Sequence, residues 1–452
     1  MSKSKTIKIK KGLNIKLEGE AEKIFIKEDL SERYAVKPSD FKDVFPKLDV
    51  KVNDEVLAGT RLFHDKKNPE IVFVSPVSGI VEAINRGERR RIVEIIIKAD
   101  CEIKYEQFEK IELDAISKTD LAGNLLKAGL WPFIQQKPFN LIANPEDKPK
   151  AIFISGFDTS PLAPDYDYIL HDEKKFFQKG IDVMSKFVSD KIHLGVNSQF
   201  PISKLYTQLK GVEIHEFIGP HPTGNVGIQI HHINPINKDE KVWFVNPQDV
   251  VTIGRFAEKG IYDASKIVAL CGSEILKPRY YKIINGTSIK NMIKQNITDN
   301  KLRFISGNVL TGKKIQPDGY LGFYDSQVTV IPEGDKYKFM GWAAPGFKKY
   351  SNSRTFLSSL LPRKKYKLDT NLNGEERAFV LTGQYEKVLP MNIFPVFLLK
   401  AILANDIEKM EKLGIYEVCE EDFALCEFVC SSKIEVQSII SKGIDMMIKE
   451  NS

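Results

Sequence analysis

Apolar and polar residues alternate with a period of two through most of the first hundred positions. The alternation is clearest in "VFPKLDVKVNDEVLAGTRLFHDKKNPEIVFVSPVSGIVEAINRG", residues 44–87. Asn-Asp, Ala-Gly and Ser-Gly pairs interrupt it at short intervals, as turns do between antiparallel strands. The pattern predicts a β-rich unit of short strands over residues 1–105.

Two stretches inside this unit, "LDVKVNDEVLAGTRLF" and "SPVSGIVEAI", resemble the halves of a biotinyl or lipoyl-type barrel-sandwich domain. Carrier domains of that type attach a cofactor to a lysine at a hairpin tip, and Lys66 or Lys67 is the nearest candidate. No Met-Lys-Met or Asp-Lys-Ala triplet marks the tip. A solvated basic turn is therefore the favoured interpretation of these two lysines.

Helical and extended patterns alternate through the middle of the chain. Ser117 or Thr119 can cap a helix over 117–129, whose leucines recur at helical spacing. Buried strands are predicted in "KAIFISGFDTSPLAPD", "KIHLGVNS", "VEIHEFIG" and "VWFVNPQDVVTIGRFAEKG", with a helix in "EKKFFQKGIDVMSKFV". This alternation predicts a Rossmann-like α/β domain over residues 106–257. Short strands and one helix near "SIKNMIKQN" then predict a β-grasp (ubiquitin-like) domain over 258–335.

The last quarter of the chain changes character twice. Residues 336–367 hold nine Lys or Arg and no acidic residue, and they predict a basic connector over 336–375. This connector is either a docking element for an acidic or membrane-proximal surface or a solvated linker. Residues 376–452 predict a C-terminal helical domain, with one apolar stripe at Leu398, Leu399, Ile402 and Leu403 and another at Ile439, Ile440, Ile444 and Ile448.

Composition narrows the function classes. The chain has 452 residues and a net charge of +6, which is modest for its length and does not favour nucleic acid as a partner. The longest apolar run, "VLPMNIFPVFLL", is interrupted by Pro390 and Pro395 and is shorter than the ~20 residues of a membrane-spanning helix. The chain therefore predicts no transmembrane segment, and any membrane role would come through partners.

Four of the seven histidines lie in "HEFIGPHPTGNVGIQIHHINPIN", residues 215–237. His231 and His232 are adjacent and would point to opposite faces of a strand, and no zinc-type spacing is present, so we expect no metal here. The prolines remove N–H donors that a phosphate would need. A stiff loop between two strands is the favoured interpretation, and it can present His221 and Thr223 to a ligand or partner.

The remaining candidate chemistry is sparse. Cys419, Cys426 and Cys430 lack the spacing of iron–sulfur ligands and are expected to be free cysteines in a helical core. No Gly-x-Ser-x-Gly, His-Glu-x-x-His or phosphate-binding glycine loop is present. Composition and spacing thus favour a multidomain, non-catalytic assembly subunit.

Several motifs together resemble one family. "KGLNIKLEGE", "DKKNPEIVFVSPVSGIVEAINRG", "HEFIGPHPTGNVGIQIHHINP" and "DFALCEFVCSSK" occur in the order found in the A subunit of the bacterial sodium-translocating NADH:quinone reductase complex. The resemblance implies barrel-sandwich, Rossmann-like, β-grasp and helical parts. It marks Gly219, Pro220, His221, Pro222, Gly224 and His231 as a family-signature loop of unknown role.

The resemblance also implies a peripheral subunit on the cytoplasmic face of the bacterial inner membrane, bound to the other subunits, including the membrane subunits. That complex passes electrons from NADH to quinone through flavins and iron–sulfur centres and exports sodium. This chain is expected to bind no redox cofactor itself. A related flavin-binding subunit has a glycine-rich loop after the helix equivalent to 117–129, where this chain has "GLWPFIQQKPF".

The same segment is a candidate quinone-binding site. Trp131 and Phe133 offer flat apolar faces, and Gln135 and Lys137 can donate to a quinone carbonyl. An aromatic cluster that closes a domain junction is the alternative. A scaffold or carrier-like module that binds only protein partners is the alternative function for the whole chain.

Overall fold

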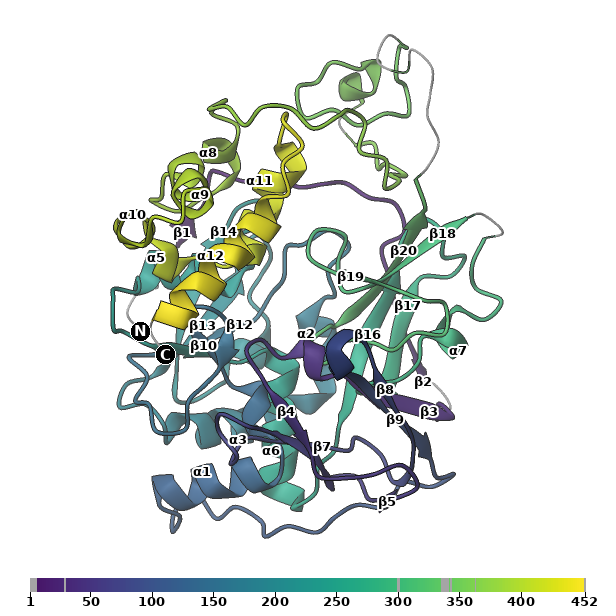
Figure 1. The fold of residues 1–452 in the computed structure, drawn as a ribbon, viewed down its shortest axis with the longest axis vertical. Coiled ribbons are helices and arrows are strands. Elements are labelled where there is room, and N and C mark those ends of the chain that lie inside the picture. Colours follow the sequence, from purple (N-terminus) through teal and green to yellow (C-terminus); the bar gives the residue numbers. More distant parts are fainter. Residues whose placement is uncertain are drawn as a thin grey trace.

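A computed structural model describes residues 6–450, apart from 28–29, 299–300, 335–340, 342–343 and 362. The chain folds into four units, of which three lie around a central α/β unit (Figure 1). The β-rich N-terminal unit lies at one end of the molecule, and the C-terminal helices lie toward the other end. The arrangement brings the other three units close to the α/β sheet.

The N-terminal unit consists of two small antiparallel sheets. Alternate residues of their strands, such as Leu62, Val81, Ile95 and Ile97, are fully buried in the core between them. The strands are β3 (Arg33–Val36), β9 (Ile92–Ala99), β8 (Gly79–Arg86) and β5 (Glu55–Val56) in one sheet, and β4 (Pro46–Leu48), β6 (Arg61–Asp65) and β7 (Val72–Val74) in the other.

A seven-stranded sheet forms the second unit. Its first five strands in spatial order are parallel, and the last two are antiparallel additions. In that order the strands are β1 (Ile7–Lys8), β14 (Val212–Ile218), β13 (Ile192–Asn197), β12 (Ile152–Ser155), β15 (Val242–Phe244), β10 (Gln135–Lys137) and β11 (Leu141–Ile142).

Both faces of this sheet are covered, as the apolar character of its strands requires. On β12, Ile152 and Ile154 join the core beneath α3 (Lys174–Ser185) and α6 (Pro247–Lys259). Phe153 points to the opposite face, where α5 (Val226–Ile233) packs. The predicted helix over 117–129 is confirmed as α1 (Lys118–Lys127), and Ser117 caps it by accepting from the Asp120 N–H.

Two segments predicted as strands are helices. Only Val242–Phe244 is extended in "VWFVNPQDVVTIGRFAEKG"; α6 follows, with Pro247 in its first turn and Gly260 in the left-handed conformation at its end. The prediction that His231 and His232 lie on a strand is also wrong, because both belong to α5. The β-branched residues there favour a strand locally. As a helix, the segment buries Ile230 against the sheet and Ile228 against the C-terminal helices.

The third unit contains a six-stranded mixed sheet and the short helix α7 (Lys290–Ile293). β16 and β17 form a hairpin, and β16 also pairs in parallel with the last strand, β20, at the centre. The spatial order is β19 (Lys313–Ile315), β18 (Leu302–Ser306), β20 (Gln327–Pro332), β16 (Ser265–Cys271), β17 (Arg279–Ile284) and β2 (Glu22–Lys27).

The first strands of the chain do not belong to the barrel-like unit in which the sequence pattern included them. β1 pairs with β14 of the α/β sheet, and β2 pairs with β17 of the six-stranded sheet. Residues 6–27 therefore connect two other units. Strand character is a local property, whereas the sheet that a strand joins depends on distant partners.

The C-terminal unit packs Leu398, Leu399, Ile402, Ile440 and Ile444 into one core, but Leu403 of the predicted stripe is 48% exposed. In the part of the chain that the structure describes, no helix has the length and apolarity needed to cross a membrane. The helices of the unit are α8 (Tyr385–Val388), α9 (Pro395–Leu403), α10 (Ile407–Lys412), α11 (Ala424–Val429) and α12 (Val436–Glu450).

Candidate functional site

A cavity of about 390 Å³ opens at the carboxyl ends of β12 and β15. Ser155 ends β12 and Asp158 follows it, and Phe244 ends β15 and Asn246 follows it; all four residues line the cavity. β13 follows β12 on one side of the sheet, whereas β15 is added on the other side, so the strand order reverses here. Open α/β sheets bind their ligands at such a reversal.

Each of the other three units contributes to the same cavity. Asp40 and Lys42 come from the N-terminal unit, and Glu421 comes from the C-terminal unit. The six-stranded unit contributes Asn308, Leu310, Thr311, Tyr324, Asp325, Ser326 and Gln327. The cavity is therefore a product of how the units pack together.

The wall offers polar groups that a ligand can satisfy. Asn140 Oδ1 is buried without a hydrogen-bond partner among the described residues. Burial raises the pKa of Asp158. Burial also raises the pKa of Glu421 to about 7, although Lys137 acts in the opposite direction. Lys42 is paired with Glu420 at 2.6 Å, so its charge is already balanced.

The family-signature loop leads from β14 to α5 along this cavity. Gly219 and Gly224 pass close to other backbone, because a Cβ there would lie 2.5 Å from Ile9 O and 2.6 Å from Thr159 N. His221 lines the cavity. Its backbone N–H donates to Asn14 Oδ1, and its imidazole Nδ1 lies 3.1 Å from Thr159 Oγ1. Burial lowers the pKa of His221 to about 4. The loop presents a neutral imidazole to the cavity. It leads into the helix α5, so the prediction that it lies between two strands is wrong.

The two histidines at the end of α5 hold the C-terminal unit. His231 Nδ1 donates to Glu417 Oε2 at 2.6 Å, and its Nε2 accepts from the Asn392 N–H at 3.0 Å. His232 Nε2 lies 2.9 Å from the Pro390 carbonyl oxygen. These contacts give the second half of the signature a structural role in joining two units.

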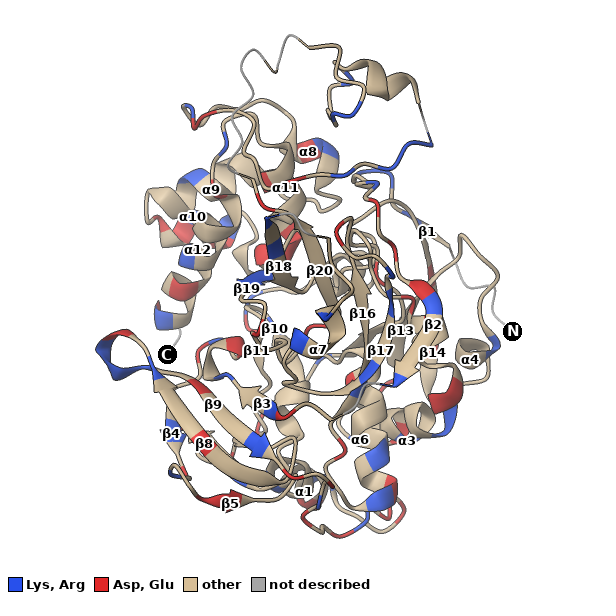
Figure 2. Cartoon of the chain, turned by 90° about the vertical axis from the view of Figure 1, so that its right-hand side faces the viewer, with Lys and Arg blue, Asp and Glu red and all other residues tan. Residues whose placement is uncertain are grey.

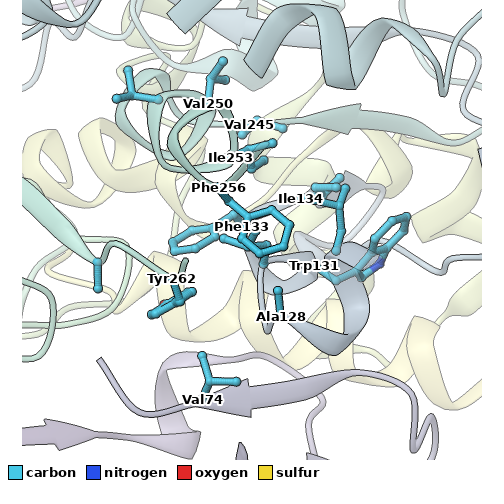
Figure 3. Packing of buried hydrophobic residues seen from close by; sticks show 14 of the residues in the cluster. Val74, Ala128, Trp131, Phe133, Ile134, Val245, Val250, Ile253, Phe256 and Tyr262 are labelled. Atoms are coloured by element: carbon cyan, nitrogen blue, oxygen red, sulfur yellow. The ribbon is translucent and has the colours of Figure 1, made fainter. Parts of the chain in front are cut away.

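The four predicted quinone-binding residues are divided between a packed core and the cavity. Trp131 is fully buried, and its ring meets that of Trp243 edge-on at 5.7 Å. Phe133 stacks on Phe323 at 4.8 Å and lies within the cluster that Figure 3 shows. Of the four, Gln135 alone lines the cavity. The two rings thus pack as expected for an aromatic cluster that closes a domain junction, which is the alternative to a quinone contact.

Lys137, the fourth predicted residue, is fully buried in a charged cluster with the C-terminal unit. Its Nζ lies 2.9 Å from Cys419 Sγ and 3.7 Å from Asp422 Oδ2. Burial lowers the pKa of Lys137, but the negative charge of this cluster outweighs burial, so the net direction is upward. Burial raises the pKa of Cys419, which stays a thiol, so the carboxylates keep the lysine protonated.

Most residues of the cavity wall were not predicted from the sequence as candidate site residues. Asp158 and Asn246 each follow a buried strand, and that position is where ligand-contacting residues of α/β sheets are found. The contributions of Asn308, Tyr324 and Glu421 depend on packing between units and have no local signal.

The fold and cavity define a multidomain α+β protein with a polar cavity where its units meet. Three family models match: the NqrA N-terminal barrel-sandwich hybrid domain over residues 7–100, the NqrA second alpha/beta domain over 116–262 and the NQRA C-terminal domain over 267–316. The chain belongs to the NqrA family, whose members are the A subunits of the Na⁺-translocating NADH-quinone reductase. The predictions of a barrel-sandwich domain, an α/β domain and a helical C-terminal region are thereby confirmed.

Individual relatives match over nearly the whole chain. The A subunit from Neisseria meningitidis serogroup B is 37% identical over 449 residues, which are 98% of this chain and 100% of the relative. The A subunit from Pasteurella multocida is 35% identical over the same shares of both chains. Among solved structures, an NAD⁺-reducing [NiFe]-hydrogenase aligns over 77% of this chain and 67% of its own, with 12% identity and a TM-score of 0.39, which does not establish a common fold.

Proposed function

We propose that the chain works as a peripheral, cofactor-free subunit of the Na⁺-translocating NADH:quinone reductase and holds a quinone headgroup in the cavity at the β12–β15 reversal. Family membership makes the chain a subunit of that complex, which couples electron transfer from NADH to quinone with sodium pumping. The observation that carries the quinone assignment is that Gln135 reaches the cavity.

The cavity wall suits a quinone chemically. Gln135, Asn140 and Asn225 offer amide donors for the two ring carbonyls, and Phe157 and Phe244 offer apolar surface for the ring. Trp131 and Phe133 anchor the segment that carries Gln135 in the buried core. Lys137 attaches the end of this segment to the C-terminal unit through Asp422. In this proposal these three residues position Gln135 and do not contact the ring.

Two features support the absence of a redox cofactor from this chain. The segment after α1, where the related flavin subunit has its glycine-rich loop, is filled by the buried side chains of Leu130, Trp131 and Phe133. Cys419, Cys426 and Cys430 lack the spacing of iron–sulfur ligands, and the Cys419 sulfur already lies 2.9 Å from Lys137 Nζ. An absorption spectrum with iron and acid-labile sulfide assays tests this, and stoichiometric flavin or iron would contradict it.

The quinone assignment is tested with Gln135→Ala and with Gln107→Ala as the matched control, since Gln107 is exposed in the segment between β9 and α1. Loss of one hydrogen bond is worth about 0.5–1.5 kcal/mol, which is a two- to roughly tenfold change in affinity. Binding of a short-chain quinone to the isolated chain is measured by calorimetry. In the assembled complex, quinone reduction should fall while NADH oxidation with an artificial acceptor is unchanged.

Equal quinone binding by wild type and Gln135→Ala, or no binding by either, would favour the alternative of a scaffold that binds only protein. A carrier role is tested separately by mass spectrometry, because a lipoyl or biotinyl group would add mass at Lys66 or Lys67. Lys67 is already engaged with Asp43 at 2.8 Å, which supports the solvated basic turn.

We further propose that the chain lies on the cytoplasmic face of the bacterial inner membrane and docks through the basic connector. The described part of the connector exposes Phe347 (59%), Leu360 (74%) and Leu361 (54%) among its basic residues. Figure 2 shows Lys and Arg along this segment at the top of the molecule. Phe339 and Trp342, which the sequence pattern includes in the connector, lie outside the described residues.

Reversal of Arg363, Lys364 and Lys365 to Glu tests this docking role. Each basic residue near an anionic leaflet contributes about 1 kcal/mol, so the triple variant should co-purify poorly with the membrane subunits. Reversal of Arg89, Arg90 and Arg91, which are exposed on a hairpin of the N-terminal unit, is the matched control. Equal co-purification of both variants at low salt, where charge attraction is least screened, would favour a solvated linker.

The strand orders support finer fold assignments for two units. The order β14-β13-β12-β15, with all four strands parallel, is that of a Rossmann-like half-sheet. In the third unit, a hairpin, a helix and a last strand parallel to the first are the features of a β-grasp domain. We assign both folds on this basis.

A further inference from the structure

Two histidines that are 22 residues apart in the sequence lie next to each other on the α/β sheet. His193 lies on β13 and His215 on the neighbouring strand β14 (Figure 1). His193 Nδ1 is 2.9 Å from His215 Nε2. Carboxylate oxygens of Glu213 lie 4.0 Å from each of these nitrogens.

The sheet register explains why the three side chains converge. His193 pairs with Glu213 across the parallel ladder, so both side chains point to the same face. His215 is two residues beyond Glu213 and returns to that face. The histidines are 15% and 16% exposed and Glu213 is 58% exposed, so the imidazoles are held in place and the carboxylate is free to turn.

We propose that His193, His215 and Glu213 form a binding site for a divalent transition metal of the zinc class, with water completing the coordination. Zinc binds imidazole nitrogen at about 2.0–2.1 Å, which puts two tetrahedral ligand atoms about 3.4 Å apart. The two nitrogens therefore need to separate by only about 0.5 Å. Rotation of the exposed Glu213 side chain brings its oxygen to a similar distance.

The protonation of the pair suits this role. Burial lowers the pKa values of His193 and of His215, so both rings are neutral near neutral pH, as metal ligands must be. At 2.9 Å the facing nitrogens share one proton. Metal binding requires the donor ring to carry its proton on the other nitrogen, and this tautomer change needs no net proton release.

A second cluster of metal-ligating residues differs from this one because a lysine already occupies it. In the described part of the chain, Cys419, Glu421 and Asp422 also bring ligand atoms within 4.8 Å of one another. There the Lys137 ammonium lies 2.9 Å from the Cys419 sulfur and supplies the positive charge. No lysine or arginine contact of this type is present at His193 and His215 among the described residues.

The site is separate from the proposed quinone cavity. His193 and Glu213 are the second residues of β13 and β14, near the amino ends of the strands, whereas the cavity lies at the carboxyl ends. A metal here would join two adjacent strands and stabilise the sheet. Metal binding at this site is therefore independent of quinone binding. The spacing of the histidines along the chain predicted no metal here.

Titration of the untagged, chelator-treated full chain with Zn²⁺, and with Co²⁺ as a spectroscopic probe, tests the site. We expect one equivalent to bind, visible cobalt bands of a tetrahedral nitrogen–oxygen site and a raised melting temperature. His193→Ala and His215→Ala should each weaken binding at least about tenfold, since each removes a ligand. His171→Ala, at an exposed histidine elsewhere, should bind like wild type.

Glu213→Ala guards against a trivial loss of fold, because its side chain is largely exposed. This variant should keep its circular dichroism spectrum and bind Zn²⁺ several-fold more weakly. Absence of a one-equivalent binding phase in the wild type would overturn the proposal. The same affinity in wild type, His215→Ala and Glu213→Ala would overturn it as well.

Discussion

Residues 131–133 and residue 135 belong to one short segment, yet they meet very different surroundings. Trp131 and Phe133 are packed between the α/β unit and its neighbours, whereas Gln135 lines the cavity at the end of the sheet. The aromatic residues resemble ligand contacts because they are large and flat. Their burial instead makes them part of the framework that positions Gln135. Residue type alone suggests a binding site. Only solvent access shows which residues line the cavity and which are buried behind its wall.

The sharpest test of this difference compares two alanine variants on the same segment. Phe133→Ala should lower the free energy of unfolding by about 3–5 kcal/mol, because it removes a buried ring that stacks on Phe323. Gln135→Ala should change it by about 0.5 kcal/mol or less, as substitutions outside a packed core usually do. Urea unfolding followed by tryptophan fluorescence measures both. Equal losses would contradict the division into support and wall.

Lys137 should behave as support of a different chemical kind. Lys137→Met should cost about 3–5 kcal/mol, because it leaves the buried Asp422 carboxylate without its cation. Adding Asp422→Asn should recover part of that loss, since the carboxylate paired with Lys137 is then removed. Chemical denaturation of the two single variants and the double variant gives the coupling. Simple additivity of the single losses would show that the ion pair contributes little.

His221 lines the cavity and should reveal itself through pH. Burial lowers its pKa from 6.5 to about 4, so the folded state resists a proton that the unfolded state accepts. Neutral His221 contributes about 3 kcal/mol to the free energy of unfolding. This contribution is complete above about pH 6.5 and is lost as the pH falls toward about 4. His221→Asn should flatten the pH dependence of unfolding in that window. An unchanged pH profile would mean that His221 titrates normally.

The smallest effect is expected at the end of α5. His231→Ala removes the hydrogen bond to Glu417 and should cost about 1–2 kcal/mol. Amide exchange should accelerate in residues 390–417, where Asn392 and Glu417 contact the imidazole, and not in the α/β sheet. His171→Ala is the matched control, because that histidine is exposed. Uniform acceleration throughout the chain would contradict a specific role in joining the two units.

Local sequence determined much of the secondary structure. The leucine spacing and Ser117 placed α1 correctly, and the apolar runs placed β12, β13 and β14. The family motifs indicate the family from the sequence alone, because they occur in the family's order over nearly the whole chain. These features depend on residues that are neighbours along the chain, so the sequence displays them directly.

The wrong predictions share one cause. α5 looks extended by composition but is helical because it must bury Ile228 and Ile230 against two different units. The apolar run at α6 favours a strand, although Pro247 and Gly260 mark the two ends of a helix. β1 and β2 joined sheets whose other strands lie far along the chain. Backbone pairing and two-sided burial are decided by distant partners.

The sequence by itself determined which elements form over much of the chain and which family the chain belongs to. The tertiary structure alone decided that Gln135 faces a cavity, that Lys137 is buried beside Cys419 and that His193 meets His215. These three outcomes depend on strand register and on packing between units. Both are set by shape and burial summed over many contacts, and spacing along the chain does not encode them locally.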